Sequence, residues 1–312
     1  MSAEKQRILV IKHSALGDFI QAMGPFAAIR AHHPAARITL LTTRPFVALA
    51  QACPYFDDVW TDSRPKVWEV AGLMKLRRML RSVKFDMVYD LQTSDRSSTY
   101  FHLMGDPPWS GIAHGCAYPH DNPDRDRMHT LDRQAEQLAM AGISPTPPPD
   151  LSWLGADLTR FNLPLRYALL VPGGAAHRPA KRWPSDRFAA LGAQLSAQGI
   201  TPVLLGTHMD GDAIRVITGN CPAALSLATR TDFADITALA RHALGAVGND
   251  TGPMHLIAAA GCPSVVLFSA DSDPALCAPR GQVTVLQTDD LAEMPLERVA
   301  EALRQRMAPL HG

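Results

Sequence analysis

The residues with the clearest chemical potential lie in short loops that follow apolar runs of the sequence. Asp18 follows the apolar run at residues 7–12 and a turn of small residues that ends at Gly17. A carboxylate there could act as a general base, because ligands of open α/β sheets collect at the carboxyl ends of the strands. The alternative is a helix N-cap, a position that aspartate favours. The motif alone leaves both roles open.

A second loop, residues 171–184, combines small residues with a basic pair. Its sequence is Val-Pro-Gly-Gly-Ala-Ala-His-Arg-Pro-Ala-Lys-Arg-Trp-Pro. Backbone amides of such a loop can approach a phosphate closely, and Lys181 would add a positive charge suited to a pyrophosphate. A solvated loop in which Trp183 packs as an anchor is an equally good interpretation.

A third loop, residues 248–255, has the sequence Gly-Asn-Asp-Thr-Gly-Pro-Met-His and joins an apolar run to a helix beginning near Pro253. The free amides of a helix start attract anions. Asp250, Thr251 and His255 would add side-chain contacts. Aspartic proteases also carry Asp-Thr-Gly, but they need a second, paired aspartate and a β-rich fold. We therefore favour an anion site.

Metal and cofactor motifs are weak in this chain. Asp271 and Asp273 flank a serine in a pattern that could hold a divalent ion, but a polar turn is the favoured interpretation. Neither a Gly-x-Gly-x-x-Gly nor a Walker A motif occurs, which disfavours dinucleotide and P-loop sites. The twelve histidines form no metal-type cluster in the sequence. We therefore expect neither metal nor cofactor.

Composition sets broader limits. The 312 residues are enough for two domains, and 46% of them are apolar, as in a folded protein. The formal net charge of zero argues against a nucleic-acid partner. Five scattered cysteines without zinc or redox spacing predict free thiols. Residues 1–7 do not resemble a signal peptide, and no apolar run approaches a bilayer span of about 20 residues. We expect a cytoplasmic protein.

Short apolar runs alternate with helical patterns along the whole chain. The expected strands are residues 7–12, 38–43, 59–60, 85–91, 167–171, 201–205, 245–248 and 264–268. The expected helices are residues 18–29, 46–52, 68–83, 187–198, 211–218, 233–241, 254–260 and 291–307. This alternation predicts α/β domains with parallel sheets. The prolines of residues 143–150 mark a boundary, so we predict two Rossmann-like domains, 1–150 and 151–312, leaving open whether the closing helix packs back on the first.

The ordered set of motifs resembles glycosyltransferase family 9, the ADP-heptose:lipopolysaccharide heptosyltransferases. The matches run through nearly the whole chain, at residues 14–18, 90–92, 96–97, 129–133, 181–184, 204–206, 227–231, 249–255 and 273–274. Such an ordered series is far more specific than any single motif.

This resemblance implies a GT-B fold, in which two Rossmann-like domains with parallel sheets face each other across a cleft. The C-terminal domain would bind ADP-L-glycero-D-manno-heptose, and the N-terminal domain a lipopolysaccharide core-type (lipid A-core) acceptor. Transfer would invert the anomeric centre without a metal. Asp18 would be the general base, and Lys181 would stabilise the departing diphosphate.

The resemblance also assigns contact residues. The donor would be bound by Gly174, Ala175, Lys181, Asp210, Thr231, Asp250, Thr251, Gly252 and His255. The acceptor would be bound by Lys12, Ser14, Arg96, His129 and Arg133. Two alternatives stay open: a nucleotide-sugar binding module without catalysis, and a GT-B enzyme that uses another nucleotide sugar.

A basic segment at residues 66–84 predicts peripheral contact with the inner membrane. It carries six cations against the single acid Glu69, and a lipid-linked acceptor would lie at an anionic surface. A solvated helix face is the alternative.

Overall fold

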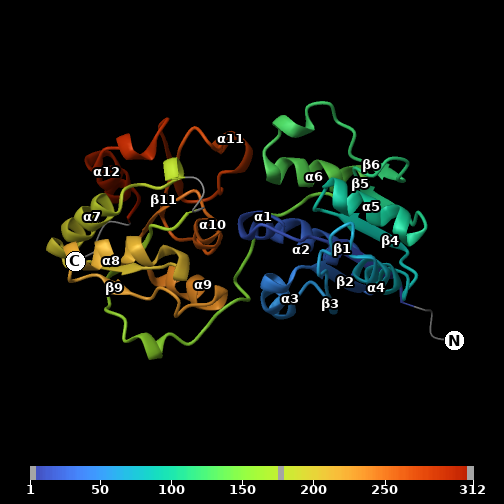
Figure 1. Ribbon diagram of the computed structural model, residues 1–312, viewed down its shortest axis with the longest axis horizontal. Helices are drawn as coiled ribbons and strands as arrows, with labels where there is room; N and C mark the ends of the chain where they lie inside the picture. The colour runs from blue at the N-terminus through green and yellow to red at the C-terminus, as the bar shows by residue number, and fades with distance from the viewer. Residues whose placement is uncertain (1–4, 175–178, 308–312) are drawn as a thin grey trace. The chain divides into compact units, whose positions relative to one another are not determined.

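The computed structural model describes residues 5–174 and 179–307 and comprises two compact units, Met1–Trp153 and Leu154–Gly312 (Figure 1). Each unit is built on one six-stranded, wholly parallel sheet with helices packed against it. The predicted α/β class with parallel sheets is therefore confirmed.

The N-terminal sheet has the order β3-β2-β1-β4-β5-β6. Its strands are β1 (Arg7–Ile11), β2 (Arg37–Thr42), β3 (Asp58–Thr61), β4 (Met87–Asp90), β5 (Trp109–Gly111) and β6 (Tyr118–Pro119). Its helices are α1 (Leu16–Gln21), α2 (Met23–His32), α3 (Val47–Ala52), α4 (Val70–Leu80), α5 (Asp95–Met104) and α6 (Thr130–Met140).

The C-terminal sheet has the order β12-β11-β10-β7-β8-β9. Its strands are β7 (Tyr167–Val171), β8 (Thr201–Leu204), β9 (Leu225–Ser226), β10 (Ala246–Asn249), β11 (Ser264–Phe268) and β12 (Val283–Gln287). Its helices are α7 (Ser185–Ala197), α8 (Gly211–Asn220), α9 (Phe233–His242), α10 (Gly252–Ala259), α11 (Pro274–Cys277) and α12 (Leu296–Arg306).

Both sheets share one topology. In each, the first and fourth strands of the unit lie side by side, β1 with β4 and β7 with β10. The chain leaves these two strands toward opposite edges of the sheet. Such a topological switch point opens a crevice at the carboxyl ends of the strands, where α/β sheets bind ligands.

Alternation along β1 explains why its run is apolar throughout. Leu9 and Ile11 join a buried cluster with Leu76 and Leu80 of α4, while Ile8 and Val10 point to the other face. Both faces of the strand are covered, and parallel strands of this kind appear as continuous apolar runs.

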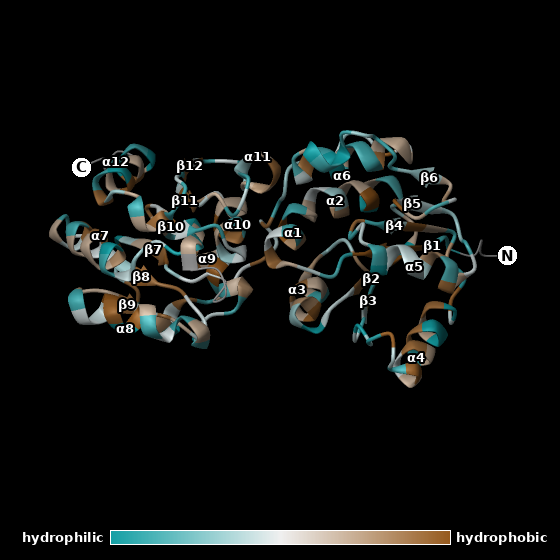
Figure 2. Ribbon diagram, turned by 45° about the horizontal axis from the view of Figure 1, so that its top comes forward, coloured by the Kyte–Doolittle hydropathy of each residue, from teal (hydrophilic) through white to brown (hydrophobic). Residues whose placement is uncertain are grey.

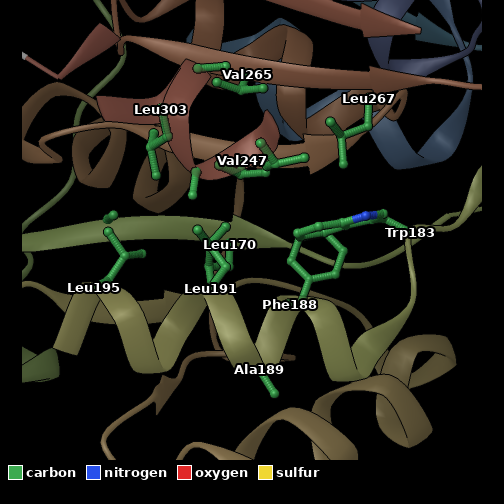
Figure 3. Packing of buried hydrophobic residues seen from close by; sticks show 14 of the residues in the cluster. Leu170, Trp183, Phe188, Ala189, Leu191, Leu195, Val247, Val265, Leu267 and Leu303 are labelled. Atoms are coloured by element: carbon green, nitrogen blue, oxygen red, sulfur yellow. The ribbon is translucent and has the colours of Figure 1, made fainter. Parts of the chain in front are cut away.

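The C-terminal core brings together β7, β10, β11, α7 and α12 (Figure 3). Trp183 is 1% exposed, packs edge-to-face on Phe188 at a centroid distance of 4.8 Å, and donates its indole N–H to Met294 O at 2.9 Å. The predicted anchoring role of Trp183 is thus observed. Val299 and Leu303 of α12 belong to the same cluster, so the closing helix packs on its own unit.

Several element boundaries differ from expectation. The helix expected at 18–29 is two helices, because Ala22 interrupts it, and the helix expected from residue 291 starts at Leu296 after Pro295. Strands β5, β6, β9 and β12 were not predicted from the pattern. Three of them have only two or three residues, and β12 is half-buried with alternating Val-Thr-Val.

Two whole-chain expectations can be compared with the described residues. All five cysteines are free. Among the helices in residues 5–174 and 179–307, none is long and apolar enough to cross a bilayer.

Candidate active site

Asp18 lies at the carboxyl end of β1 but is not the N-cap of the helix. Helix α1 begins at Leu16, its N-cap is Ala15, and Asp18 is the third helical residue. The N-cap alternative is therefore wrong, because the helix starts two residues earlier than the pattern indicates. From the third position the Asp18 carboxylate accepts the backbone N–H of Ala15 through Oδ2 at 3.1 Å. A negative charge in the first turn is also favoured by the helix dipole.

Gln92 holds the turn that precedes α1, the helix of Asp18. Its Oε1 accepts the backbone N–H of His13 at 2.8 Å and that of Ser14 at 3.3 Å. Gln92 is fixed in turn by Asp90, whose Oδ1 accepts the N–H groups of Gln92 and Thr93 at 3.1 and 3.0 Å. The Asp-Leu-Gln motif is thus a clamp that joins the ends of β1 and β4.

Lys12 lies beneath this turn. Its side chain is buried, and Nζ donates to the carbonyl oxygen of Leu91 at 3.0 Å. Burial lowers the pKa of Lys12, while the nearby carboxylate of Asp18 opposes that shift and Arg133 adds to it. The charge of Asp18 therefore favours the protonated form of Lys12. Both the acceptor role predicted for Lys12 and that predicted for Ser14 stay predictions.

Asp90 is a buried acid at the centre of the same region. The side chain is fully buried, and this burial raises its pKa to about 6. The hydrogen bonds from Thr93 and Gln92 and the charge of Lys12 oppose the shift without cancelling it. A carboxyl group with this pKa changes charge close to neutral pH.

The three remaining acceptor candidates all have contacts within the N-terminal unit. The guanidinium of Arg96 donates to Pro65 O from both terminal nitrogens. His129 is the N-cap of α6, and its Nδ1 accepts the N–H of Leu131 at 3.2 Å. Arg133 lies one turn further, with its N–H bonded to His129 O at 2.9 Å. His129 and Arg133 thus lie one turn apart at the start of α6, and their acceptor roles stay predictions.

In the C-terminal unit, the side chain of Lys181 contacts residues of two loops. Its Nζ lies 3.4 Å from Oδ2 of Asp250, a residue that follows β10. It also donates to Oγ of Ser272, which lies in the loop after β11. His255 Nε2 lies 3.9 Å from Asp250 Oδ1. Burial would raise the pKa of Asp250, but the neighbouring side chains of His255 and Ser272 and the charge of Lys181 outweigh it and lower the pKa. Asp250 is therefore an anion here, and it balances the charge of Lys181.

Asn249 closes the C-terminal switch point. Its side chain is fully buried; Oδ1 accepts the N–H of Trp183 at 3.0 Å, and Nδ2 donates to the carbonyls of Pro172 and Gly173, both at 3.0 Å. One amide thus fixes the glycine turn after β7 and the segment next to Lys181.

Helix α10 starts at Gly252, three residues after Asn249, with Thr251 as N-cap and a proline in the first turn. The Thr251 hydroxyl donates to Asn249 O at 3.1 Å, so it does not cap the helix amides. The positive end of the helix dipole, close to a lysine, is a favourable environment for a phosphate.

The other donor candidates lie at the same edge of the C-terminal sheet. Asp210 follows β8 and packs so closely on Gly173 that a Cβ there would lie 2.8 Å from its carboxylate. Thr231 follows β9 and precedes α9, and Gly174 O accepts from Arg182. Ala175 lies outside the described residues. The structure therefore gathers the described candidates at one edge, while their roles stay predictions.

Asp273 is part of a turn. Its Oδ1 accepts the N–H of Ala275 at 2.8 Å, and Asp273 is thus the N-cap of α11. The hydroxyl of Ser272, between the two aspartates, is the group that reaches Lys181. Within residues 5–174 and 179–307 there is no group of three side chains suited to a metal ion. Metal independence stays a prediction.

Three residues of this region were not predicted to have a site role. Gln92 and Asn249 lay inside quoted motifs, but their side chains bind backbone, which a sequence pattern does not reveal. Ser272 was overlooked because its acidic neighbours suggested a metal motif. A carboxamide at or just after the end of a predicted parallel strand is the signal that could have identified the first two.

The sequence is similar to known glycosyltransferases. The family model described as glycosyltransferase family 9 (heptosyltransferase) matches residues 73–301. Lipopolysaccharide heptosyltransferase 2 of Escherichia coli (strain K12) is 26% identical over 294 residues, covering 85% of this chain and 83% of that protein.

Solved structures extend the likeness to the fold. The structure of E. coli ADP-heptose lps heptosyltransferase II gives a TM-score of 0.81 at 23% identity, covering 96% of this chain and 98% of that one. E. coli heptosyltransferase WaaC with ADP gives 0.78 at 18% identity, covering 96% and 100%. The predicted GT-B fold is confirmed.

The buried acid leads to a pH prediction. Because the folded pKa of Asp90 is about 6 against an ordinary 3.8, the folded state binds this proton more tightly than the unfolded chain. Protonated Asp90 therefore contributes about 3 kcal/mol to the free energy of unfolding at low pH, and this contribution is lost as the pH rises through 6. Asp90→Asn keeps an oxygen for the two backbone amides and cannot ionise. We expect its free energy of unfolding, relative to wild type, to rise by on the order of 2–3 kcal/mol between pH 4 and pH 7 in urea titrations. Parallel pH profiles of the two proteins would contradict the assignment.

Proposed function

Since the chain belongs to glycosyltransferase family 9, the heptosyltransferase family, we propose that it transfers a heptose from ADP-L-glycero-D-manno-heptose to a lipopolysaccharide core-type acceptor. The observation that carries the donor class is the convergence of Lys181, Asp250 and Ser272 beside the start of α10. A cation, a hydroxyl and the positive end of a helix dipole together suit a diphosphate. The names of the E. coli relatives, which specify ADP-heptose and lipopolysaccharide, support the same substrates.

In the donor half, Lys181 and the α10 amides would hold the diphosphate. Lys181 is paired with Asp250 in the protein alone, so its ammonium is already oriented and largely desolvated. A donor phosphate would share this ammonium, and negative charge grows on that phosphate as the sugar departs. Interactions that strengthen with this charge lower the barrier to transfer.

In the acceptor half, Asp18 would be the general base. The acceptor hydroxyl oxygen forms a bond to the anomeric carbon, the bond from that carbon to the diphosphate oxygen breaks, and its electron pair leaves with ADP. The hydroxyl proton passes to Asp18. One Asp18 oxygen accepts from Ala15, and the other has no hydrogen-bond partner within the described part of the chain, so it is available for the proton. Attack from the face opposite the leaving group inverts the anomeric centre.

The alternatives predict different products. A binding module would hold ADP-heptose and transfer nothing, and a GT-B enzyme of another specificity would use a different nucleotide sugar. Purified protein is therefore incubated with ADP-heptose or UDP-N-acetylglucosamine and a panel of truncated lipopolysaccharide cores, and the products are read by mass spectrometry. The proposal expects the mass of one heptose added to at least one core. Binding without transfer, or transfer from the other donor alone, would refute it.

Lys181 supplies a prediction for the donor half. Lys181→Ala removes a cation that faces growing charge, so the turnover number of the folded variant is expected to fall on the order of 10²-fold. Because the variant also leaves the carboxylate of Asp250 without its cationic partner, its unfolding temperature is expected to fall as well. Arg215→Ala is the control, since it removes an exposed cation on α8. Equal activity of the two variants would make Lys181 an ordinary surface lysine.

Arg133 supplies a prediction for the acceptor half. Its charge acts on Lys12, which places it on the Asp18 side of the sheet, and a guanidinium suits an anionic sugar or phosphate group. Arg133→Gln is expected to raise KM for the acceptor by a larger factor than KM for the donor. Steady-state kinetics with each substrate varied in turn measure both, and the reverse ranking would remove Arg133 from the acceptor site.

A further inference from the structure

Four large apolar side chains are exposed around the start of α4. Val67 is 81% exposed, Trp68 71%, Val70 67% and Met74 54%. In Figure 2 this part of the chain has brown apolar residues next to teal polar ones. Scattered exposed apolar residues are ordinary, but a tryptophan among three aliphatic neighbours within eight positions is a contiguous patch. We call these four residues the apolar tip.

The apolar tip continues into a basic surface. The cations of the segment are Lys66, Lys75, Arg77, Arg78, Arg81 and Lys84, all of them exposed, and Glu69 is the only acid among residues 66–84. The carboxylate of Glu69 accepts the backbone N–H of Lys66 at 2.5 Å, so part of its charge serves the turn before the helix.

Helix α4 has two distinct faces. Leu76 and Leu80 lie in the buried cluster of the N-terminal unit. Val70, Met74, Arg77 and the C-cap residue Arg81 follow one another at helical spacing on a separate, exposed face. This exposed row is apolar at its start and cationic at its end, so it can present both kinds of group to one surface.

The segment that carries the tip is held in place by side chains. The hydroxyl of Tyr100 donates to Asp62 Oδ2 at 2.6 Å, Asp62 Oδ1 accepts the N–H of Arg64 at 2.7 Å, and Arg96 donates to Pro65 O. Lys66 Nζ lies 5.1 Å above the ring of Trp68. Because these contacts fix the approach to α4, little chain entropy is lost when the tip binds a surface.

We propose that the apolar tip and the basic face of α4 dock this protein on an anionic phospholipid surface. Trp68 and its neighbours would enter the headgroup and upper acyl region, where tryptophan is favoured. The cations would contact lipid phosphates, and each is worth about fivefold in partitioning, from ~1 kcal/mol per basic residue near such a surface. Complementarity of charge selects lipid over a second copy of this chain, since two copies would face each other with like charge.

The place of this surface in the fold gives it a use. The segment leaves β3 at its carboxyl end, the same edge of the sheet at which Asp18 follows β1. Docking would bring that edge toward a lipid-anchored acceptor. The docking surface goes beyond the proposed function, and its test needs no turnover.

The experiment is co-sedimentation of the full chain with vesicles of phosphatidylethanolamine and phosphatidylglycerol, and with vesicles of phosphatidylcholine alone. Binding is expected only to the anionic vesicles, and it weakens as salt rises. The combined variant Lys75→Gln, Arg77→Gln, Arg78→Gln is expected to lower the partition coefficient on the order of 10²-fold. Val67→Ser with Trp68→Ser is expected to lower it at least about tenfold.

Leu165→Ser is the matched control, because Leu165 is fully exposed in the other unit, and it is expected to bind like wild type. Thermal unfolding of every variant checks that the exposed substitutions leave the fold intact. The proposal is overturned if wild type does not bind anionic vesicles at low salt, or if the glutamine and the serine variants both bind as well as the control. It is also overturned if sedimentation shows a dimer that the serine variant dissolves, since the tip would then join two copies.

Discussion

A side-chain carboxamide closes the switch point of each sheet, fully buried in Asn249 and half-buried in Gln92, and the candidate residues of each unit depend on it. Gln92, two residues after β4, accepts the amides of the turn that follows β1. Asn249, the last residue of β10, binds the carbonyls of the turn that follows β7. Where two neighbouring parallel strands lead the chain in opposite directions, their ends lose ladder partners, and unpaired buried backbone groups are costly. One side-chain amide in each unit meets that requirement. Gln92 fixes the turn that leads to the helix of Asp18, and Asn249 fixes the turn that leads to Lys181.

Charge is arranged in pairs around both clamps. Lys181 and Asp250 form an ion pair at the C-terminal switch point, and the charge of Asp18 acts on the buried ammonium of Lys12 at the N-terminal one. In each unit an opposite charge limits the penalty of desolvation before substrate arrives. The ion pair orients the ammonium of Lys181 for a phosphate, and the N–H of Ala15 orients the carboxylate of Asp18 that would take a proton.

The sequence predicted the long buried strands well, because strands covered on both faces, such as β1 and β7, are apolar at nearly every position. It predicted the loops that gather the donor candidates, since carboxyl ends of parallel strands share one edge. It did not predict where α1 begins, because Ala15 carries no capping side chain, so Asp18 was placed two residues too early in the helix. Helix α5 was missed since its Ser- and Thr-rich first turns resemble a loop, although Ser94 caps it. Contacts between distant residues, such as Lys181 with Ser272, leave no local pattern.

The proposed transfer depends on Asp18, which takes the proton from the hydroxyl group of the acceptor. The most direct measurement compares Asp18→Asn with wild type on one preparation each, by thermal unfolding, by ADP binding and by turnover with ADP-heptose. Asparagine can still accept the Ala15 N–H through its oxygen, so the unfolding temperature and ADP binding should be nearly unchanged. The turnover number should fall by roughly 10²–10⁴-fold, the usual contribution of a positioned base. Full turnover in Asp18→Asn would contradict the account and leave Asp18 as a residue of the helix start alone.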